Sequence, residues 1–311
     1  MNKIKMVGLV ILALLWFSSE IIAEPNQMKS QTCQMCNLRY EDFSKSDLTD
    51  SDFGGSYLFG SNFAWSIVKN TNLKSAILIN TRMEWADFDN SDFSKATLED
   101  CIMFRSSFQY VNFRLCNLAR ANLSRTLLKG ANFLTANLQN ANLSNSNAAG
   151  AVFRNADMRN AIIISASLRE ADLQGAVLSH ADLRGSDLDI ANFSGSILTY
   201  ANFSSSYVGN TNFRGAQLDH ADFSNSILDA VNFQGASLCN ANLRGAVLSN
   251  VNMLQTDLCG AILPDGSIGE CQQTKNKSID DYTGLKPKQD QGKNINLNPA
   301  ESYYNNSQKA I

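Results

Sequence analysis

The 311-residue chain has few of the groups on which catalysis or metal binding usually depends. It contains two histidines, His180 and His220, and neither an HExxH motif nor a glycine-rich phosphate loop. Ser179 stands next to His180, but no acidic residue is placed to orient the imidazole of a nucleophilic pair. The sequence therefore argues against an enzyme, and it predicts no cofactor and no metal ion.

A long hydrophobic run is also missing. The apolar stretch near the N-terminus covers residues 7–17, which is too short for a comfortable membrane span. Lys3 and Lys5 precede it and Ala23 follows it, which is the order of regions in a secretory signal peptide. We therefore predict a cleaved signal peptide over residues 1–23 and export to the periplasm or the medium, with no stable membrane span after cleavage. An uncleaved segment that anchors the protein to the membrane is the alternative.

What the sequence does contain is an unbroken period of five residues from Cys36 to Asp265. Each pentapeptide has an apolar centre, mostly Leu or Phe, and a small residue two positions earlier, with Glu41 as the exception. The centres run from Leu38 to Leu263 and correspond to about 46 repeats. Such a period must decide the fold, because no other pattern in the chain persists for so long.

Five residues per repeat require a corner in each repeat. The centre (position i) and the small residue (i−2) share one face of an extended backbone. Since five is odd, the next centre would point to the opposite face unless the chain turned at i+1 and i+2. Four right-angled corners close a square coil of twenty residues, whereas an α-helix would gain no apolar stripe from this spacing. Between 171 and 265, two opposite sides carry mostly Asn or Asp at i−1, which suits bonds to backbone groups at the corners.

Residues twenty apart should lie above one another on adjacent coils, roughly 4.8 Å apart. One column at i+2 contains Trp65, Trp85, Arg105 and Arg125, and a second contains His180, Tyr200 and His220. The two histidines would be about 10 Å apart, too far for one metal ion to bridge. Both columns are candidate interaction surfaces, because exposed aromatic residues can form a binding strip. The alternative is that stacking only stabilises neighbouring coils.

The segments ADLQG at 171–175, ADLRG at 181–185 and ANLRG at 241–245 resemble the A(D/N)LXX consensus of the pentapeptide repeat family. The resemblance covers about three quarters of the chain. It implies an all-β fold, a right-handed quadrilateral parallel β-helix. It implies less about function, because fold and function are loosely tied. Some members of the family are acidic rods that mimic DNA and occupy the DNA-binding groove of gyrase.

Charge is banded along the predicted rod. The net charge is −5 over residues 36–100, +6 over 101–170 and −6 over 171–265. A DNA mimic needs continuous negative charge, and an exported protein does not meet gyrase, so nucleic-acid mimicry is the less favoured alternative. The sequence favours an exported, non-enzymatic structural or interaction module whose flat faces bind another protein or the cell envelope. A homodimer is left open, and binding of nucleic acid is not expected.

The two ends of the repeat region are predicted to be irregular. Residues 24–35 form a polar linker or cap that ends in the pair Cys33 and Cys36, whose CxxC spacing fits a metal half-site, a redox pair or a disulfide. A disulfide is favoured, because no second CxxC and no nearby His completes a zinc site. At the other end, Pro264 stops the ladder, and residues 266–311 have the composition of a flexible polar tail.

The remaining cysteines fall into two groups. Cys101 and Cys116 occupy i−2 positions, so they should be buried and reduced. Cys239 and Cys259 occupy i+1 positions twenty residues apart, which predicts a disulfide between adjacent coils. Cys271 competes for Cys259, and we give the Cys239–Cys259 pairing a slight preference over Cys259–Cys271.

Overall fold

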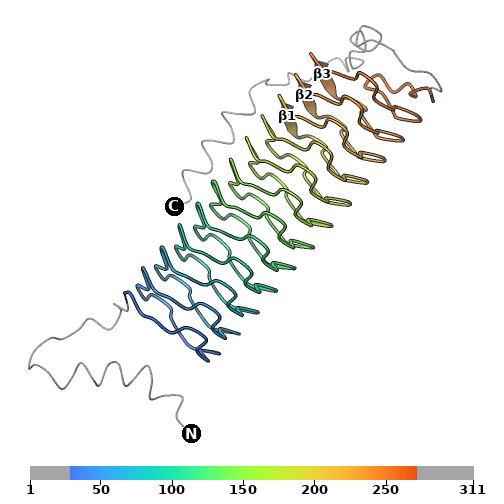
Figure 1. Ribbon diagram of the computed structural model, residues 1–311. Helices are drawn as coiled ribbons and strands as arrows, with labels where there is room; N and C mark the ends of the chain where they lie inside the picture. Colours follow the sequence, from blue (N-terminus) through green and yellow to red (C-terminus); the bar gives the residue numbers. More distant parts are fainter. Residues whose placement is uncertain (1–28, 272–311) are drawn as a thin grey trace, which may run out of the picture.

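The computed structural model describes residues 29–271, which form a straight rod of stacked coils (Figure 1). The predicted signal peptide, the start of the linker and tail residues 272–311 lie outside the described residues. Parallel bridges join residues twenty apart, from Thr32 opposite Asp52 to Asn242 opposite Ile262. Twenty residues therefore complete one coil, as the sequence predicts. Within residues 29–271 there is no helix, and so none that could cross a membrane.

Each side of a coil bonds to the coils on both sides of it. The Leu183 amide donates to the carbonyl of Asn202 on the following coil at 2.7 Å, and the Asp182 amide donates to the carbonyl of Ala161 on the preceding coil at 2.9 Å. On one side of the rod these bridges lengthen into three parallel strands, β1 (Tyr207–Gly209), β2 (Ile227–Asp229) and β3 (Val247–Ser249), paired in the order β1-β2-β3.

The core consists of the repeat centres, stacked coil on coil. Phe133 lies on Phe153 and Phe203 lies on Phe223, each pair with ring centroids 4.7 Å apart. The residues at i−2 must be small because they fill the space between these columns, and they are Ala, Ser or Thr in most repeats. Hydroxyls in this position mostly donate to backbone carbonyls, although Ser146 Oγ is buried without a hydrogen-bond partner in the described structure. Ser186 Oγ, for example, donates to the carbonyl of Ile163 at 2.6 Å.

The corners lie at i+1 and i+2, as predicted. The amide of the next i−2 residue closes a turn onto the carbonyl of the centre, and Ser46 donates to Phe43 at 3.2 Å in this way. The residue at i+2 adopts a left-handed backbone, with φ of 58° at Lys45 and 64° at Trp65. Gly and Asn tolerate that conformation best, whereas a bulky side chain is unusual there.

Asn and Asp at i−1 have the predicted structural role. Asn202 Oδ1 accepts the amide of Ser204 at 2.9 Å, which fixes the corner. Along the rod, Asn242 Nδ2 donates to Asp222 Oδ1 at 3.1 Å. These side chains therefore support the fold, and their oxygen atoms are engaged in it.

The solenoid is slightly longer than the predicted repeat region. Because Thr32 pairs with Asp52, residues 31–35 already form a side of the first coil and are not a linker. At the other end residues 266–271 belong to a cap rather than to a flexible tail. They reverse direction after Pro264, and Ile268 pairs antiparallel with Ile262.

Candidate interaction surface

The structure brings the four residues of the first predicted column together at one corner of the rod. Trp65 and Trp85 stack with ring centroids 4.9 Å apart and planes inclined by 5°. The Arg105 guanidinium lies 4.6 Å from the centroid of the Trp85 ring, on the next coil. Arg125 continues the column on the coil after that. We call these four residues the tryptophan–arginine column.

Phe104 joins this column, and the sequence analysis did not identify it. Its ring centroid is 5.3 Å from the guanidinium carbon of Arg105 and 6.0 Å from that of Arg125, so both cations lie over one ring. Phe104 also meets Trp85 edge-on, with centroids 6.3 Å apart. The sequence did contain a signal for Phe104. It is a large aromatic residue at an i+1 position whose column has the small residues Ser44 and Ser124 on other coils.

The column is exposed in spite of its size. Trp65 leaves 56% of its surface accessible and Trp85 leaves 36%. Both tryptophans have left-handed backbones, with φ of 64° and 59°. The fold favours Gly or Asn at such positions, so a tryptophan there costs conformational energy without entering the core. Two exposed isoleucines flank the corner, Ile67 just after Trp65 and Ile102 just before Phe104.

The two arginines of the column and Arg114 lack acidic partners within residues 29–271, whereas the other four arginines of the basic band are paired as follows: Arg120 with Glu99 and Asp100, Arg154 with Asp172, Arg159 with Asp157, and Arg169 with Asp187 and Asp189. The pairing affects titration, because hydrogen bonds from Arg120 lower the pKa of the Asp100 carboxyl. Ion pairs thus neutralise four of the eight cations of the band within the described residues, but neither of the two arginines at this corner.

Carboxylates near the column are already engaged. Glu84, at the same corner, accepts two bonds of 3.2 Å from Arg82 through its Oε1 atom. Its Oε2 atom is buried without a hydrogen-bond partner in the described structure. On the next side of the rod, Asp87 pairs with Lys69 at 2.7 Å. None of these ion pairs includes Arg105 or Arg125.

The second predicted column is also present. His180, Tyr200 and His220 stack with parallel rings, the centroids being 4.9 Å and 4.5 Å apart in turn. Tyr200 separates the two imidazoles. Asp219 accepts hydrogen bonds from Ser237 Oγ and from the Cys239 amide, so its carboxylate supports the corner. Among the described residues no three potential metal ligands gather in one place.

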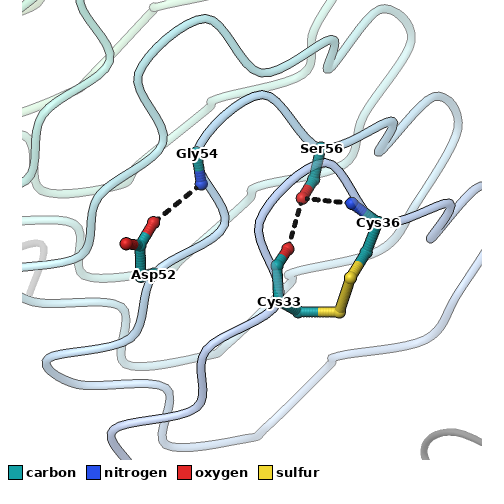
Figure 2. Close-up of a disulfide and its surroundings, with 5 residues drawn as sticks. All are labelled: Cys33, Cys36, Asp52, Gly54 and Ser56. Carbon is teal, nitrogen blue, oxygen red and sulfur yellow. Dashed lines mark hydrogen bonds between the residues drawn. A yellow bond between two sulfur atoms is a disulfide. The ribbon is translucent and has the colours of Figure 1, made fainter.

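A disulfide joins Cys33 to Cys36, whose Cα atoms are 5.5 Å apart, and this is the arrangement that the sequence favours. Figure 2 shows how Ser56 of the next coil holds the loop: its hydroxyl donates to the Cys33 carbonyl at 2.6 Å and accepts from the Cys36 amide at 3.1 Å. Beside it, the Gly54 amide donates to Asp52 Oδ1 at 2.9 Å. The pair therefore ties together two adjacent sides of the first coil across one corner.

The preferred pairing at the other end was wrong. Cys259 is bonded to Cys271, and Cys239 carries a free thiol. Cys239 and Cys259 lie in register on adjacent coils, so their side chains point in parallel rather than toward each other, which a disulfide disfavours. The reversal of residues 266–271 instead brings Cys271 back over the last coil. Cys101 and Cys116 are buried and free, as predicted.

These features define a four-sided parallel β-solenoid with a five-residue repeat. The chain belongs to the pentapeptide repeat family, whose repeats are matched at residues 33–64, 69–103, 105–134, 136–175, 176–215, 196–231 and 226–263. Members of this family form right-handed quadrilateral β-helices, which confirms the predicted fold class. They are generally structural or interaction modules rather than enzymes.

Solved structures of the family resemble this chain to different extents. A pentapeptide repeat protein from the thylakoid lumen of Arabidopsis thaliana is 37% identical over 28% of this chain and 61% of its own length, with a TM-score of 0.28. HetL, involved in heterocyst differentiation regulation in the cyanobacterium Nostoc sp. strain PCC 7120, is 28% identical over 86% of this chain and 100% of its own, with a TM-score of 0.25. QnrB1, a plasmid-mediated fluoroquinolone resistance protein, is 18% identical over 75% of this chain and 92% of its own, with a TM-score of 0.29. No curated protein matches the chain.

Proposed function

We propose that this protein is an exported, non-enzymatic interaction module that presents its corners and sides to a protein partner or to the cell envelope. The observation that carries the proposal is the tryptophan–arginine column. Trp and Arg are the residues most enriched at the energetic centres of protein interfaces. Here the tryptophans and Arg125 are exposed, Arg105 is half-buried, and both arginines are unneutralised within the described rod, although the fold itself requires neither residue type at these positions.

Two features support export. The N-terminal sequence has the order of regions of a signal peptide. Both ends of the rod also carry a disulfide, Cys33–Cys36 and Cys259–Cys271, and disulfides persist in oxidising compartments. The alternative is that an uncleaved N-terminal segment anchors the protein to the membrane.

The competing function is an acidic rod that mimics DNA and binds gyrase. The acidic stretches at 36–100 and 171–265 favour it. Against it, the arginines at 105 and 125 interrupt the negative charge with cations that a DNA-binding groove would repel.

Two measurements test the proposal. Cell fractionation with N-terminal sequencing should place the mature protein outside the cytoplasm, starting near Glu24. The purified protein should leave gyrase supercoiling unaffected at concentrations where an acidic mimic inhibits it. A cytoplasmic, uncleaved chain would contradict export, and inhibition lost on neutralising Asp182, Asp187 and Asp189 would establish the competing function.

A further inference from the structure

We propose that the tryptophan–arginine column binds an extended acidic segment of a partner protein, with carboxylates at both ends of a short apolar stretch. The inference rests on the proposed function, because it names the partner that an interaction module would hold at this corner. It is built from the orientation of the rings, the unpaired cations and the spacing of the coils.

The stacking decides which part of each indole a ligand can reach. Trp65 and Trp85 face each other, and Arg105 covers the outer face of Trp85. The ring faces between these residues are therefore occupied, so Trp85 offers mainly its ring edges, while Trp65 keeps one face that no described ring or guanidinium covers. Aromatic edges carry partial positive charge, and the indole N–H is a donor without acceptor capacity. The corner thus presents an electropositive surface made of apolar edges and hydrogen-bond donors.

Three cations reinforce that potential. Lys45 precedes Trp65 in the same column, and within residues 29–271 it forms no ion pair; nor do Arg105 and Arg125. The carboxylates on the flanking sides are committed elsewhere: Asp42 accepts from Ser44 and Asn62, Asp47 pairs with Lys29, Glu84 with Arg82 and Asp87 with Lys69. A group that complements three free cations must bring its own negative charge.

The coil spacing sets the pattern of the ligand. Lys45 lies three coils from Arg105, a distance of about 14 Å at the spacing of hydrogen-bonded strands. An extended chain covers that distance in about four steps of roughly 3.3 Å, which leaves about three residues between its charges. The intervening side chains would meet the tryptophan edges and the exposed Ile67 and Ile102. A further carboxylate, beyond the one at Arg105, would reach Arg125 one coil further along.

Other anionic ligands fit less well. Sugars and nucleic-acid bases stack on aromatic faces, and the column uses three of the four tryptophan faces internally. A peptide segment needs no free ring face, since carboxylates bond to guanidinium and indole N–H groups while aliphatic side chains pack against ring edges. The observations therefore favour an acidic peptide over a polyanionic glycan or a single-stranded nucleic acid.

The test uses the purified full chain and a fluorescein-labelled peptide in which glutamates flank a stretch of leucine and tyrosine, followed by fluorescence anisotropy. The wild-type protein should bind this peptide, more weakly at higher salt, and should not bind the peptide with glutamine in place of glutamate. The variant R105Q/R125Q should weaken binding at least about tenfold. Its matched control is R114Q/R214Q, which removes two exposed arginines at another corner that form no ion pair within residues 29–271, and it should change binding less than about twofold.

Trp85→Leu should also weaken binding, whereas Tyr110→Leu, an exposed aromatic at a different corner, should not. Thermal unfolding of each variant identifies any that fails to fold. Three results would overturn the inference: no binding of the acidic peptide, equal losses in R105Q/R125Q and R114Q/R214Q, or tighter binding of heparin or a single-stranded oligonucleotide in the same assay. If the exported protein captures a partner that R105Q/R125Q still binds, the inference fails while the proposed function stands.

Discussion

Tyr200 and His220 are twenty residues apart in the sequence, yet their rings are parallel to within 1° and their centroids are 4.5 Å apart. The same separation stacks Trp65 on Trp85 at another corner. Contacts along the rod therefore follow from the coil length, and the neighbours of any side chain can be read from the sequence. This regularity makes matched substitutions straightforward to choose.

Replacing the core residue Phe203 with Asp should unfold the rod, because an unpaired charge would enter a dry column of phenylalanines. We expect a loss of more than about 4 kcal/mol in the free energy of unfolding, measured by denaturant titration with circular dichroism. Ser205→Asp, at an exposed corner of the same coil, is the control and should change stability by less than about 0.5 kcal/mol. Equal stability of the two variants would mean that position i does not face inward.

Two glycines in one corner column separate backbone strain from crowding. Gly130 and Gly150 both have φ of 65°, so alanine at either position should cost about 1 kcal/mol. A Cβ at Gly130 would lie 2.6 Å from the Tyr110 ring, whereas at Gly150 nothing lies within 4 Å. G130A should therefore be less stable than G150A by up to about 1 kcal/mol in denaturant melts. If G150A were the weaker variant, the ring would not pack over Gly130.

The buried thiols should make the rod sensitive to alkali. Burial raises the pKa of Cys101 and of Cys116 to about 12, whereas an unfolded thiol ionises near about 8.5. Between these values the unfolded chain releases protons that the folded chain keeps. Stability should therefore fall as the pH rises, by about 1.4 kcal/mol per pH unit for each thiol.

Urea midpoints at pH 7, 9 and 10 measure this slope. The variant C101S/C116S should flatten it, because Ser already fills the same i−2 position at Ser106 and Ser186. An unchanged slope in that variant would assign the alkaline loss to other groups.

Breaking the Cys259–Cys271 bond should loosen the last coil. We expect Cys271→Ser to accelerate amide hydrogen exchange at Gly260 and Gly269. The Gly260 amide donates to the carbonyl of Gly269 at 3.0 Å, and the Gly269 amide donates to the carbonyl of Ala261 at 2.7 Å. Exchange at the first coil, held by Cys33–Cys36, serves as the internal control and should not change. Peptide mapping under non-reducing conditions should recover both disulfides and a free Cys239.

The period of five predicted most of this structure, because one apolar centre and one small residue per repeat decide the direction of every side. It also predicted both stacked columns, which depend only on a separation of twenty. It could not predict the cap at 266–271. That segment leaves the period and reverses direction, so its contact with Ile262 and the pairing of Cys271 depend on a single non-repeating turn.

The surface charges were predicted less well for a different reason. When charge is summed along the sequence, Arg154 and Arg169 both contribute to the positive band at residues 101–170. In three dimensions Arg154 reaches Asp172 and Arg169 reaches Asp187, each eighteen residues later and so diagonally across one coil step. The contacts between adjacent coils are needed to show which cations remain without an ion pair. Arg105 and Arg125 are two that do so within the described residues.

The reversed segment at the C-terminal end also determines what the rod does in a crowded solution. A parallel ladder that simply stopped would leave a row of open amides and carbonyls, which is a template for another chain. Here Gly269 and Ile268 run antiparallel across the last coil, and Pro264 offers no amide donor. A second rod cannot extend the ladder in register on the side of Ile262, so the reversed segment hinders growth end to end into fibres on one of the four sides.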